Sequence, residues 1–145
     1  MNILLDTNVL LDLLLEREPF VEDAKQVFQA KDAGRINIYI TANSLTDVFY
    51  IGRRTRVKDM SGEKALQEAL TDVVTCLKTL EICTVDRYAL EQAATLTGSD
   101  FEDNLQAACA VIASLDAIVT RDEGFSATTV PVLSPADLMA KLAVS

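Results

Sequence analysis

The sequence predicts an α/β fold in which a mostly parallel sheet of about five strands lies between layers of helices. Short apolar runs of strand length alternate with longer segments of helical periodicity along the whole chain. Half of the 145 residues are hydrophobic, which is enough for a sizeable core without disulfides or structural zinc. No linker, repeat or low-complexity segment interrupts the alternation, so we expect one domain over residues 1–145.

Five short apolar segments are the predicted strands. The first, Asn2–Asp6, has the continuous apolar character of a strand buried on both faces, and it stops at a carboxylate. The second, Arg35–Ile40, alternates and is rich in β-branched residues. The other three are Glu81–Val85, Ala117–Thr120 and Val130–Leu133.

Helical patterns fill the segments between these strands. The first runs from Val9 to Leu15, and Pro19 opens a second helix that Gly34 closes. The third predicted helix is capped by Thr41 or Asn43 and runs into residues 53–58, and the fourth extends from Ser61 through Leu77. The fifth covers residues 86–97 and is stopped by Gly98, and the sixth covers 100–115 and is capped by Ser99. The last begins at Ser134-Pro135.

The composition excludes several kinds of chemistry. The chain has no histidine, which removes Ser–His–Asp and Cys–His nucleophile systems, HExxH zinc sites and haem bound through a proximal histidine. Cys76, Cys83 and Cys109 are odd in number, have no C-x-x-C spacing and lie in apolar surroundings, so we expect buried free thiols in a reducing compartment. No secretory signal pattern and no membrane-length apolar run is present, so we expect a cytoplasmic protein without membrane contact.

Acidic residues stand where a parallel sheet places ligand sites. Asp6 and Asp122 each follow a predicted strand, and ligands of such sheets bind outside the carboxyl ends of the strands. Asp100 and Asp103 share one face in the first turn of a predicted helix, and Asp47 lies in the helix after the second strand. Carboxylates gathered at one edge repel one another unless a cation neutralises them. The pattern therefore favours a cation site.

Each of these acids also has a plain structural explanation, and the sequence leaves it open. The alternatives are an N-cap for the segment Asp6-Thr7-Asn8, a solvated helix surface for Asp47, complementation of the helix dipole for Asp100 and Asp103, and an Asp-Glu-Gly turn for Asp122.

Four motifs in order resemble the PIN-domain (PilT N-terminus) ribonucleases, including the VapC-type toxins. The resemblance extends from residue 2 to about residue 138. Each motif is weak alone, but four in succession at this spacing are a strong signal. They are Leu4-Leu5-Asp6-Thr7-Asn8-Val9-Leu10, Ser44-Leu45-Thr46-Asp47, the segment 100–108 (DFEDNLQAA) and the segment 118–125 (IVTRDEGF).

The resemblance implies a metal-dependent endoribonuclease that hydrolyses RNA phosphodiester bonds, as the toxin of a toxin–antitoxin pair. It further implies Mg²⁺ or Mn²⁺ as cofactor, an antitoxin protein as partner and a homodimer. Position by position, it implies catalytic roles for Asp6, Asp47, Asp103 and Asp122, metal binding by Asp6, Asp100, Asp103 and Asp122, and supporting roles for Asn8 and Thr120.

One of these positions departs from the family. Asp47 stands where the family more often has glutamate, which shortens that arm by one methylene group. The other acids agree with the chemistry, because hard divalent cations prefer oxygen ligands and activate water without any histidine.

The net charge conflicts with binding of a polyanion. Thirteen basic and 22 acidic residues give a formal charge of −9, whereas nucleic-acid binding proteins usually carry a basic patch. One dense basic run is present, and we expect it to bind RNA backbone, although a solvated helix end explains it equally well. Its cations are Arg53, Arg54, Arg56 and Lys58.

Two other functions remain as alternatives. A phosphatase with an aspartate nucleophile would favour D-x-D after the first strand, but Asn8 occupies the second position. A catalytically weak PIN-like domain that binds RNA or protein is supported by Asp47 and by the acidic surface.

Overall fold

The structure is a computed structural model that describes residues 1–123, 125 and 128–144. Five parallel strands form one sheet in the order β3-β2-β1-β4-β5, which confirms the predicted α/β class and parallel sheet. The strands are β1 (Asn2–Leu5), β2 (Asn37–Thr41), β3 (Glu81–Cys83), β4 (Ala117–Val119) and β5 (Val132–Leu133).

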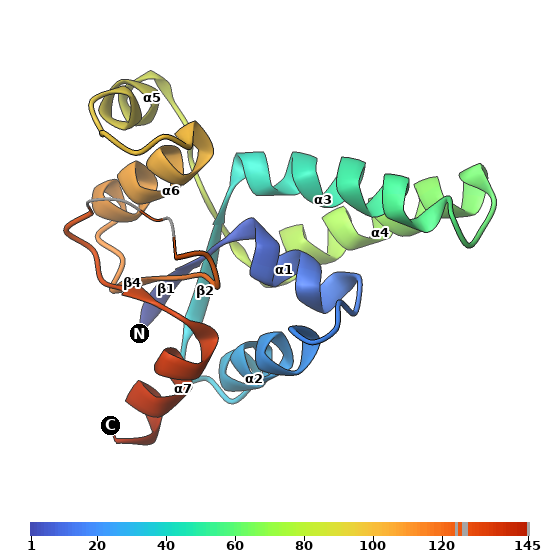
Figure 1. Cartoon of the computed structure of the whole chain (residues 1–145), viewed down its shortest axis with the longest axis horizontal. Helices are drawn as coiled ribbons and strands as arrows, with labels where there is room; N and C mark the ends of the chain where they lie inside the picture. The colour runs from blue at the N-terminus through green and yellow to red at the C-terminus, as the bar shows by residue number, and fades with distance from the viewer. Residues whose placement is uncertain (124, 126–127, 145) are drawn as a thin grey trace.

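Helices connect the strands and cover the sheet (Figure 1). None of the helices in the described residues is long and apolar enough to cross a membrane. They are α1 (Thr7–Leu14), α2 (Val21–Asp32), α3 (Ala42–Arg56), α4 (Gly62–Thr79), α5 (Arg87–Ala94), α6 (Phe101–Ile112) and α7 (Pro135–Ala143).

Several helices begin, or are capped, at other residues than the sequence predicts. Helix α2 begins at Val21 rather than at Pro19. The predicted cap of α6, Ser99, is wrong, because the carboxylate of Asp100 accepts the amide hydrogen of Asp103 at 3.1 Å. Helix α1 begins at Thr7, two residues earlier than predicted, since the Asp6 carbonyl already accepts the amide hydrogen of Val9.

The predicted stop of α2 at Gly34 is confirmed. Gly34 has φ of 75°, a left-handed conformation that glycine adopts without steric cost. The amides of Gly34 and Arg35 donate to the carbonyls of Lys31 and Ala30, both at 2.9 Å. This pair of hydrogen bonds satisfies the last free carbonyls of α2 and turns the chain into β2.

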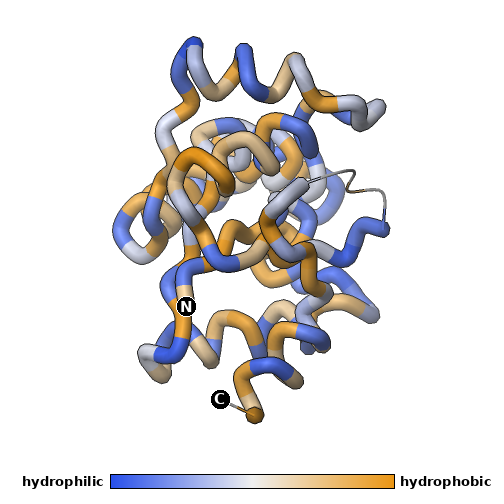
Figure 2. The backbone as a smooth tube through the Cα atoms, turned by 90° about the vertical axis from the view of Figure 1, so that its left-hand side faces the viewer, coloured by the Kyte–Doolittle hydropathy of each residue, from blue (hydrophilic) through white to orange (hydrophobic). Residues whose placement is uncertain are grey.

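The sheet separates two apolar cores. Ile3 and Leu5 of β1 point to one side, where α1, α2, α3, α4 and α7 contribute to the core. Leu4 points to the other side, which α5 and α6 cover (Figure 1). Along the helices hydrophobic and hydrophilic residues alternate (Figure 2), as expected when each helix buries one side. All three cysteines are buried free thiols, as predicted.

The strand order reverses beside β1. The chain adds β2 and β3 on one side of β1 and then returns to add β4 and β5 on the other side. In open α/β sheets such a reversal separates the connections at the carboxyl ends of the two central strands and leaves a crevice for a ligand. Here the crevice is bounded by the residues after β1 and after β4, which are Asp6 and Thr120.

Candidate active site at the carboxyl ends of the strands

Asp6 is the buried centre of the candidate site. Only 4% of the residue is exposed, and its side chain makes no capping hydrogen bond although it occupies the N-cap position of α1. Instead its two oxygens accept hydrogen bonds from the Thr120 hydroxyl at 2.7 Å and from the Gln106 amide at 3.1 Å. The side chain therefore faces the crevice between β1 and β4, and the simple capping explanation does not account for it.

The segment after β4 closes one side of the crevice. Thr120 is buried, and its hydroxyl also accepts the backbone amide of Asp122 at 2.9 Å. This one hydroxyl connects Asp6 to the backbone of Asp122, which agrees with the supporting role expected of Thr120. Asp122 is exposed at the rim. Gly124, the last residue of the alternative turn, lies outside the described residues.

Asp103 enters the same site from the first turn of α6. The pKa of Asp103 is raised to about 6, first by burial and then by the negative charges of Asp100, Asp6 and Asp122 in that order. The acids that follow β1 and β4 thus lie within electrostatic range of the acid on α6. Asp100 itself is exposed and caps α6, so its plain structural explanation holds at least in part.

Glu102 belongs to the acidic cluster, and the sequence analysis gave it no role. The pKa of Glu102 is raised to about 7. The causes, from the largest, are burial, a hydrogen bond to Asp47, and the negative charges of Asp47, Asp100 and Asp6. Asp100 and Asp103 are three residues apart and share a helix face, whereas Glu102 is not at helical spacing from Asp100 and was not selected. The available signal was its position within three acids in four residues.

Asp47 therefore faces another carboxyl group rather than open solvent. It is half-buried on α3, and the two acids line a cavity of about 150 Å³ between α3 and α6. One oxygen of Glu102, Oε1, is buried without a hydrogen-bond partner among the described residues. The solvated-surface explanation of Asp47 does not describe this environment.

Gln106 is the second residue that sequence reasoning missed. It is 1% exposed, and while its Nε2 donates to Asp6, its Oε1 has no hydrogen-bond partner in the described part of the chain. The signal was an amide side chain directly before the alanine-rich stretch of α6, three residues after Asp103. A polar side chain at such a position must be placed by a specific contact.

The start of α1 is joined to the start of α3 by hydroxyl groups. Thr7 Oγ1 and Ser44 Oγ lie 2.7 Å apart, and Ser44 Oγ lies 3.3 Å from Thr41 Oγ1, all three residues being buried. Asn8, which was expected to support the site, is exposed instead, because α1 begins at Thr7 and turns Asn8 outward. Thr7, to which the sequence analysis gave no role of its own, makes the buried contact with Ser44.

The basic run is divided by the structure. Arg53, Arg54 and Lys58 are exposed at the end of α3 farthest from the sheet (Figure 1). Arg56 is mostly buried, with 13% of its side chain exposed, and contacts Glu68 at 3.3 Å and Asp72 at 2.5 Å on α4. The expectation for Arg56 is corrected, because its guanidinium joins α3 to α4.

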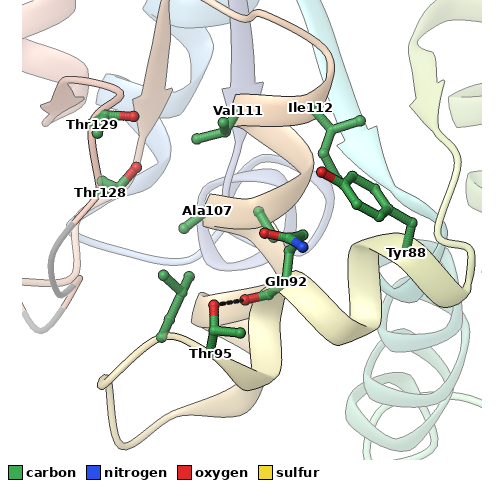
Figure 3. A pocket seen from close by; sticks show the side chains of 10 residues that line it. Tyr88, Gln92, Thr95, Ala107, Val111, Ile112, Thr128 and Thr129 are labelled. Carbon is green, nitrogen blue, oxygen red and sulfur yellow. Dashed lines mark hydrogen bonds between the residues drawn. The ribbon is translucent and has the colours of Figure 1, made fainter.

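A cavity of about 240 Å³ lies elsewhere, between α5, α6 and residues 128–129 (Figure 3). Tyr88, Ala107, Val111 and Ile112 contribute to its lining, and no carboxylate does so. It offers apolar contact but no chemistry. The candidate active site is therefore the acidic crevice.

Sequence comparison decides the family. A sequence profile described as PIN domain matches residues 2–124, and these include Asp6, Asp47, Asp103 and Asp122. The chain belongs to the PIN-domain family. A search among curated proteins finds no match.

Solved structures show the same PIN-domain fold. The structure titled as FitAB bound to an IR36 DNA fragment superposes with a TM-score of 0.68 at 19% identity, over 92% of this chain and 94% of that one. FitAcB from Neisseria gonorrhoeae gives 0.64 at 23% identity, over 92% and 98%. VapBC2 from Rickettsia felis, bound to a DNA fragment from its promoter, gives 0.56 at 17% identity, again over 92% and 98%.

The donors of this PIN domain suit a hard cation. Every acid that faces the crevice offers oxygen atoms, the ligands that Mg²⁺ and Mn²⁺ prefer. Within residues 1–123, 125 and 128–144, however, no three such side chains are spaced as a ready-made ligand group. The pKa values of Asp103 and Glu102 are raised first by burial and then by the negative charges of neighbouring acids, so the site accumulates negative charge. A divalent cation would supply the missing positive charge.

Proposed function

We propose that this PIN domain is a metal-dependent endoribonuclease. One observation carries the proposal: Asp6, buried at the strand-order reversal, receives its side-chain hydrogen bonds within the described residues from two neutral groups, Thr120 and Gln106. Burial, and then the charges of neighbouring acids, raise the pKa of Asp103 and Glu102 beside it. Unpaired buried carboxylates are costly, and binding of a cation is the usual reason for keeping them.

The proposed ligands are Asp6, Asp103 and Asp122, with Asp100 at the edge. Mg²⁺ or Mn²⁺, when bound, would supply an activated water and neutralise charge on the scissile phosphate. Thr120 and Gln106 orient Asp6, because each holds one of its oxygens and leaves the other lone pairs directed at the crevice. Burial, the hydrogen bond to Asp47 and the charges of neighbouring acids raise the pKa of Glu102 to about 7, so Glu102 keeps its proton to higher pH than an ordinary glutamate.

RNA is the proposed substrate, and the exposed cations Arg53, Arg54 and Lys58 are the proposed contacts to its backbone. Arg53 and Arg54 lie on the same helix as Asp47, and Lys58 follows the end of that helix, so an RNA strand that reaches the crevice along α3 would pass them. The formal charge of −9 includes the acids of the crevice, which a bound cation would partly neutralise. This leaves the end of α3 as a local positive area on an acidic protein.

We further propose that the protein acts as a toxin with an antitoxin partner, as the family resemblance implies. The solved structures named FitAB and VapBC2 are two-component complexes by their titles. The outer side of α4 exposes Leu70, Val74 and Leu77 at helical spacing, an apolar stripe that suits a protein partner. A short adjacent gene whose product suppresses toxicity on co-expression would support the pairing, and light scattering tests the expected homodimer.

The deciding experiment is cleavage of one RNA by the purified protein with Mg²⁺, with Mn²⁺ and with EDTA, beside DNA of the same sequence. We expect cleavage of RNA that EDTA abolishes and added Mn²⁺ restores. Asp103→Asn, purified identically, controls for contaminating nucleases and should be inactive. Cleavage by Asp103→Asn at the wild-type rate would overturn the proposed site.

The second candidate is a catalytically weak domain that binds RNA or protein. Asp47 favours it, because its short side chain makes contact with Glu102 instead of extending alone toward the crevice. In that case the protein would bind RNA without cleaving it under any metal condition.

A further inference from the structure

Arg121 separates two residues that face the crevice, yet its own side chain is bound elsewhere. Its Nε donates to Asp12 Oδ2 at 2.7 Å and its Nη2 donates to Asp12 Oδ1 at 3.3 Å. The guanidinium also lies over the ring of Phe20, 3.9 Å from the ring centre. Two hydrogen bonds and one ring contact fix this side chain against α1 and the start of α2.

Asp12 is a buried carboxylate that needs a positively charged partner. It is 1% exposed at the middle of α1, where an unpaired carboxylate would be costly. Arg17 supplies a second but looser contact, with its Nη1 3.7 Å from Asp12 Oδ1. The tighter, two-point contact goes to Arg121, which lies 109 residues away in the sequence. The pair therefore joins α1 to the segment that follows β4.

The three residues after β4 direct their contacts to different sides. Thr120 donates to Asp6, and its hydroxyl holds the amide of Asp122, while Arg121 between them is bound to Asp12. Arg121 lies at a bend shortly after β4, and the Asp122 amide is tied back to the Thr120 hydroxyl across it. Fixing the Arg121 side chain against α1 therefore also restrains the backbone that carries Thr120 and Asp122.

We propose that the ion pair of Asp12 with Arg121 is a positioning device for the acidic site, which holds Thr120 and Asp122 in place opposite Asp6. Neither partner touches the metal or the substrate in this role. The inference rests on the proposed function for its catalytic meaning, but the positioning itself is a property of the protein alone.

A purely electrostatic role for Arg121 predicts the opposite sign of effect. Its positive charge lies within range of Asp6 and Asp122, and those two charges, after the larger influence of Asp12, raise the pKa of Arg121. Removing that charge would make the site more negative and tighten cation binding. Removing a positioning contact would instead weaken cation binding, since misdirected ligands typically cost about 10–100-fold in metal affinity.

The test compares four variants by calorimetric titration with Mn²⁺ alone. We expect Asp12→Asn, which keeps the shape and the Arg121 charge, to weaken Mn²⁺ binding about tenfold, and Arg121→Ala to weaken it at least as much. Arg121→Lys should lie between this value and the wild type, because lysine keeps the charge but not the two-point contact. Arg17→Ala is the matched control: it also removes a partner of Asp12, and should leave the affinity within about twofold.

A second measurement needs no metal. The Asp122 amide, which donates to Thr120, should exchange its hydrogen with solvent faster in Asp12→Asn and Arg121→Ala than in Arg17→Ala. Tighter Mn²⁺ binding by Arg121→Ala, or unchanged affinity and exchange in Asp12→Asn, would overturn the inference. If the wild type binds no Mn²⁺, the proposed function fails, and the exchange of the Asp122 amide still decides the positioning role.

Discussion

Asp6 and Asp12 are six residues apart and almost equally buried, yet they meet opposite surroundings. Asp12, 1% exposed, contacts the guanidinium groups of Arg121 and Arg17. Asp6, 4% exposed, receives one hydroxyl and one amide hydrogen bond, and its charge reaches the acids on α6. The same residue type has guanidinium groups as direct partners at one position and neutral hydrogen-bond donors, among the described residues, at the other.

The difference separates a structural carboxylate from a functional one. A buried carboxylate with charged partners is satisfied within the fold, and its removal is felt as lost stability. A buried carboxylate with neutral donors and negative neighbours is held in position but lacks a counter-charge. The protein keeps this arrangement at the strand-order reversal, where open α/β folds bind their ligands. Two arginines supply the counter-charge of Asp12, and a bound cation is the counter-charge that we propose for Asp6.

The largest expected effect is on the cleavage rate and comes from replacing Asp6 by asparagine, which exchanges one carboxylate oxygen for an amide group. We expect Asp6→Asn to lower the rate of RNA cleavage roughly a thousandfold, because a metal ligand contributes several kcal/mol to stabilising the reacting charge. Single-turnover cleavage with Mn²⁺ measures it. Asp12→Asn, the comparison variant, should retain far more activity. An equal loss of cleavage rate in Asp6→Asn and Asp12→Asn would contradict the distinction between a functional and a structural carboxylate.

Stability should change in the reverse order. Asp12→Asn leaves two arginines without their carboxylate and should lower the free energy of unfolding by about 2 kcal/mol, less than for a fully buried pair because both arginines can turn toward water. Asp103→Asn removes one of several mutually repelling charges and should leave the metal-free protein as stable as the wild type or more so. Urea unfolding of the metal-free proteins at pH 7.5 measures both changes. A destabilised Asp103→Asn would show that this acid, too, is structural.

Variants of Asp47 and Glu102 test whether these two acids together replace the glutamate that is more usual in the family at position 47. Asp47→Asn should lower the cleavage rate about tenfold, an effect of roughly 1.4 kcal/mol on the barrier. Asp47→Glu should retain or improve activity, and Glu102→Gln should match Asp47→Asn. Full activity in Asp47→Asn with loss in Glu102→Gln would assign the position to Glu102 alone.

Strand ends and helix periodicity were predictable because they depend on local pattern. The acid after β1, the polar residue after β4 and the first turn of α6 follow from chain order once the sheet is parallel. The family resemblance then singled out Asp6, Asp103 and Asp122 from the 22 acidic residues. These residues are brought to one edge by topology rather than by any single contact.

The missed residues depend on contacts across the fold. Gln106 and Glu102 have roles only because α6 packs beside β1 and α3, which no local pattern reveals. Arg56 looked like its exposed neighbours, but the α4 acids Glu68 and Asp72 take up its charge. The start of α1 at Thr7 buries Thr7 and leaves Asn8 exposed, which depends on where the helix begins.

The pH dependence of stability should show the unneutralised charge directly. The folded-state pKa values of Asp103, about 6, and Glu102, about 7, lie above their ordinary values of 3.8 and 4.5. Between the ordinary and raised values the folded state binds more protons than the unfolded state, so stability falls as pH rises. The thermal midpoint of the metal-free protein should therefore drop by a few degrees between pH 5 and 8, roughly 3 °C per kcal/mol.

A matched variant identifies the source of that drop. Asp103→Asn cannot ionise and should reduce the drop between pH 5 and 8, while Glu102 still contributes its part. Asp103→Asn combined with Glu102→Gln should flatten the profile, whereas Asp12→Asn should shift it down without flattening it. Saturating Mn²⁺ should raise the wild-type midpoint most at pH 8, because the cation binds the ionised carboxylates of the folded state. A flat profile for the metal-free wild type would contradict the repulsion inferred at Asp6.

The smallest expected effect concerns the exposed cations at the far end of α3. Arg53→Gln combined with Arg54→Gln removes two charges that release counterions when they meet phosphates, so the slope of log affinity against log salt should flatten by about 1.4 for single-stranded RNA. Binding is measured with the inactive Asp103→Asn protein, which avoids cleavage. Lys25→Gln combined with Lys141→Gln changes the net charge equally on α2 and α7, and should leave the slope unchanged. Because neither arginine is a proposed ligand, Mn²⁺ affinity should stay constant in both double variants. Equal slopes in the two double variants would assign Arg53 and Arg54 to a solvated helix end, as their place at the carboxyl terminus of α3 also allows.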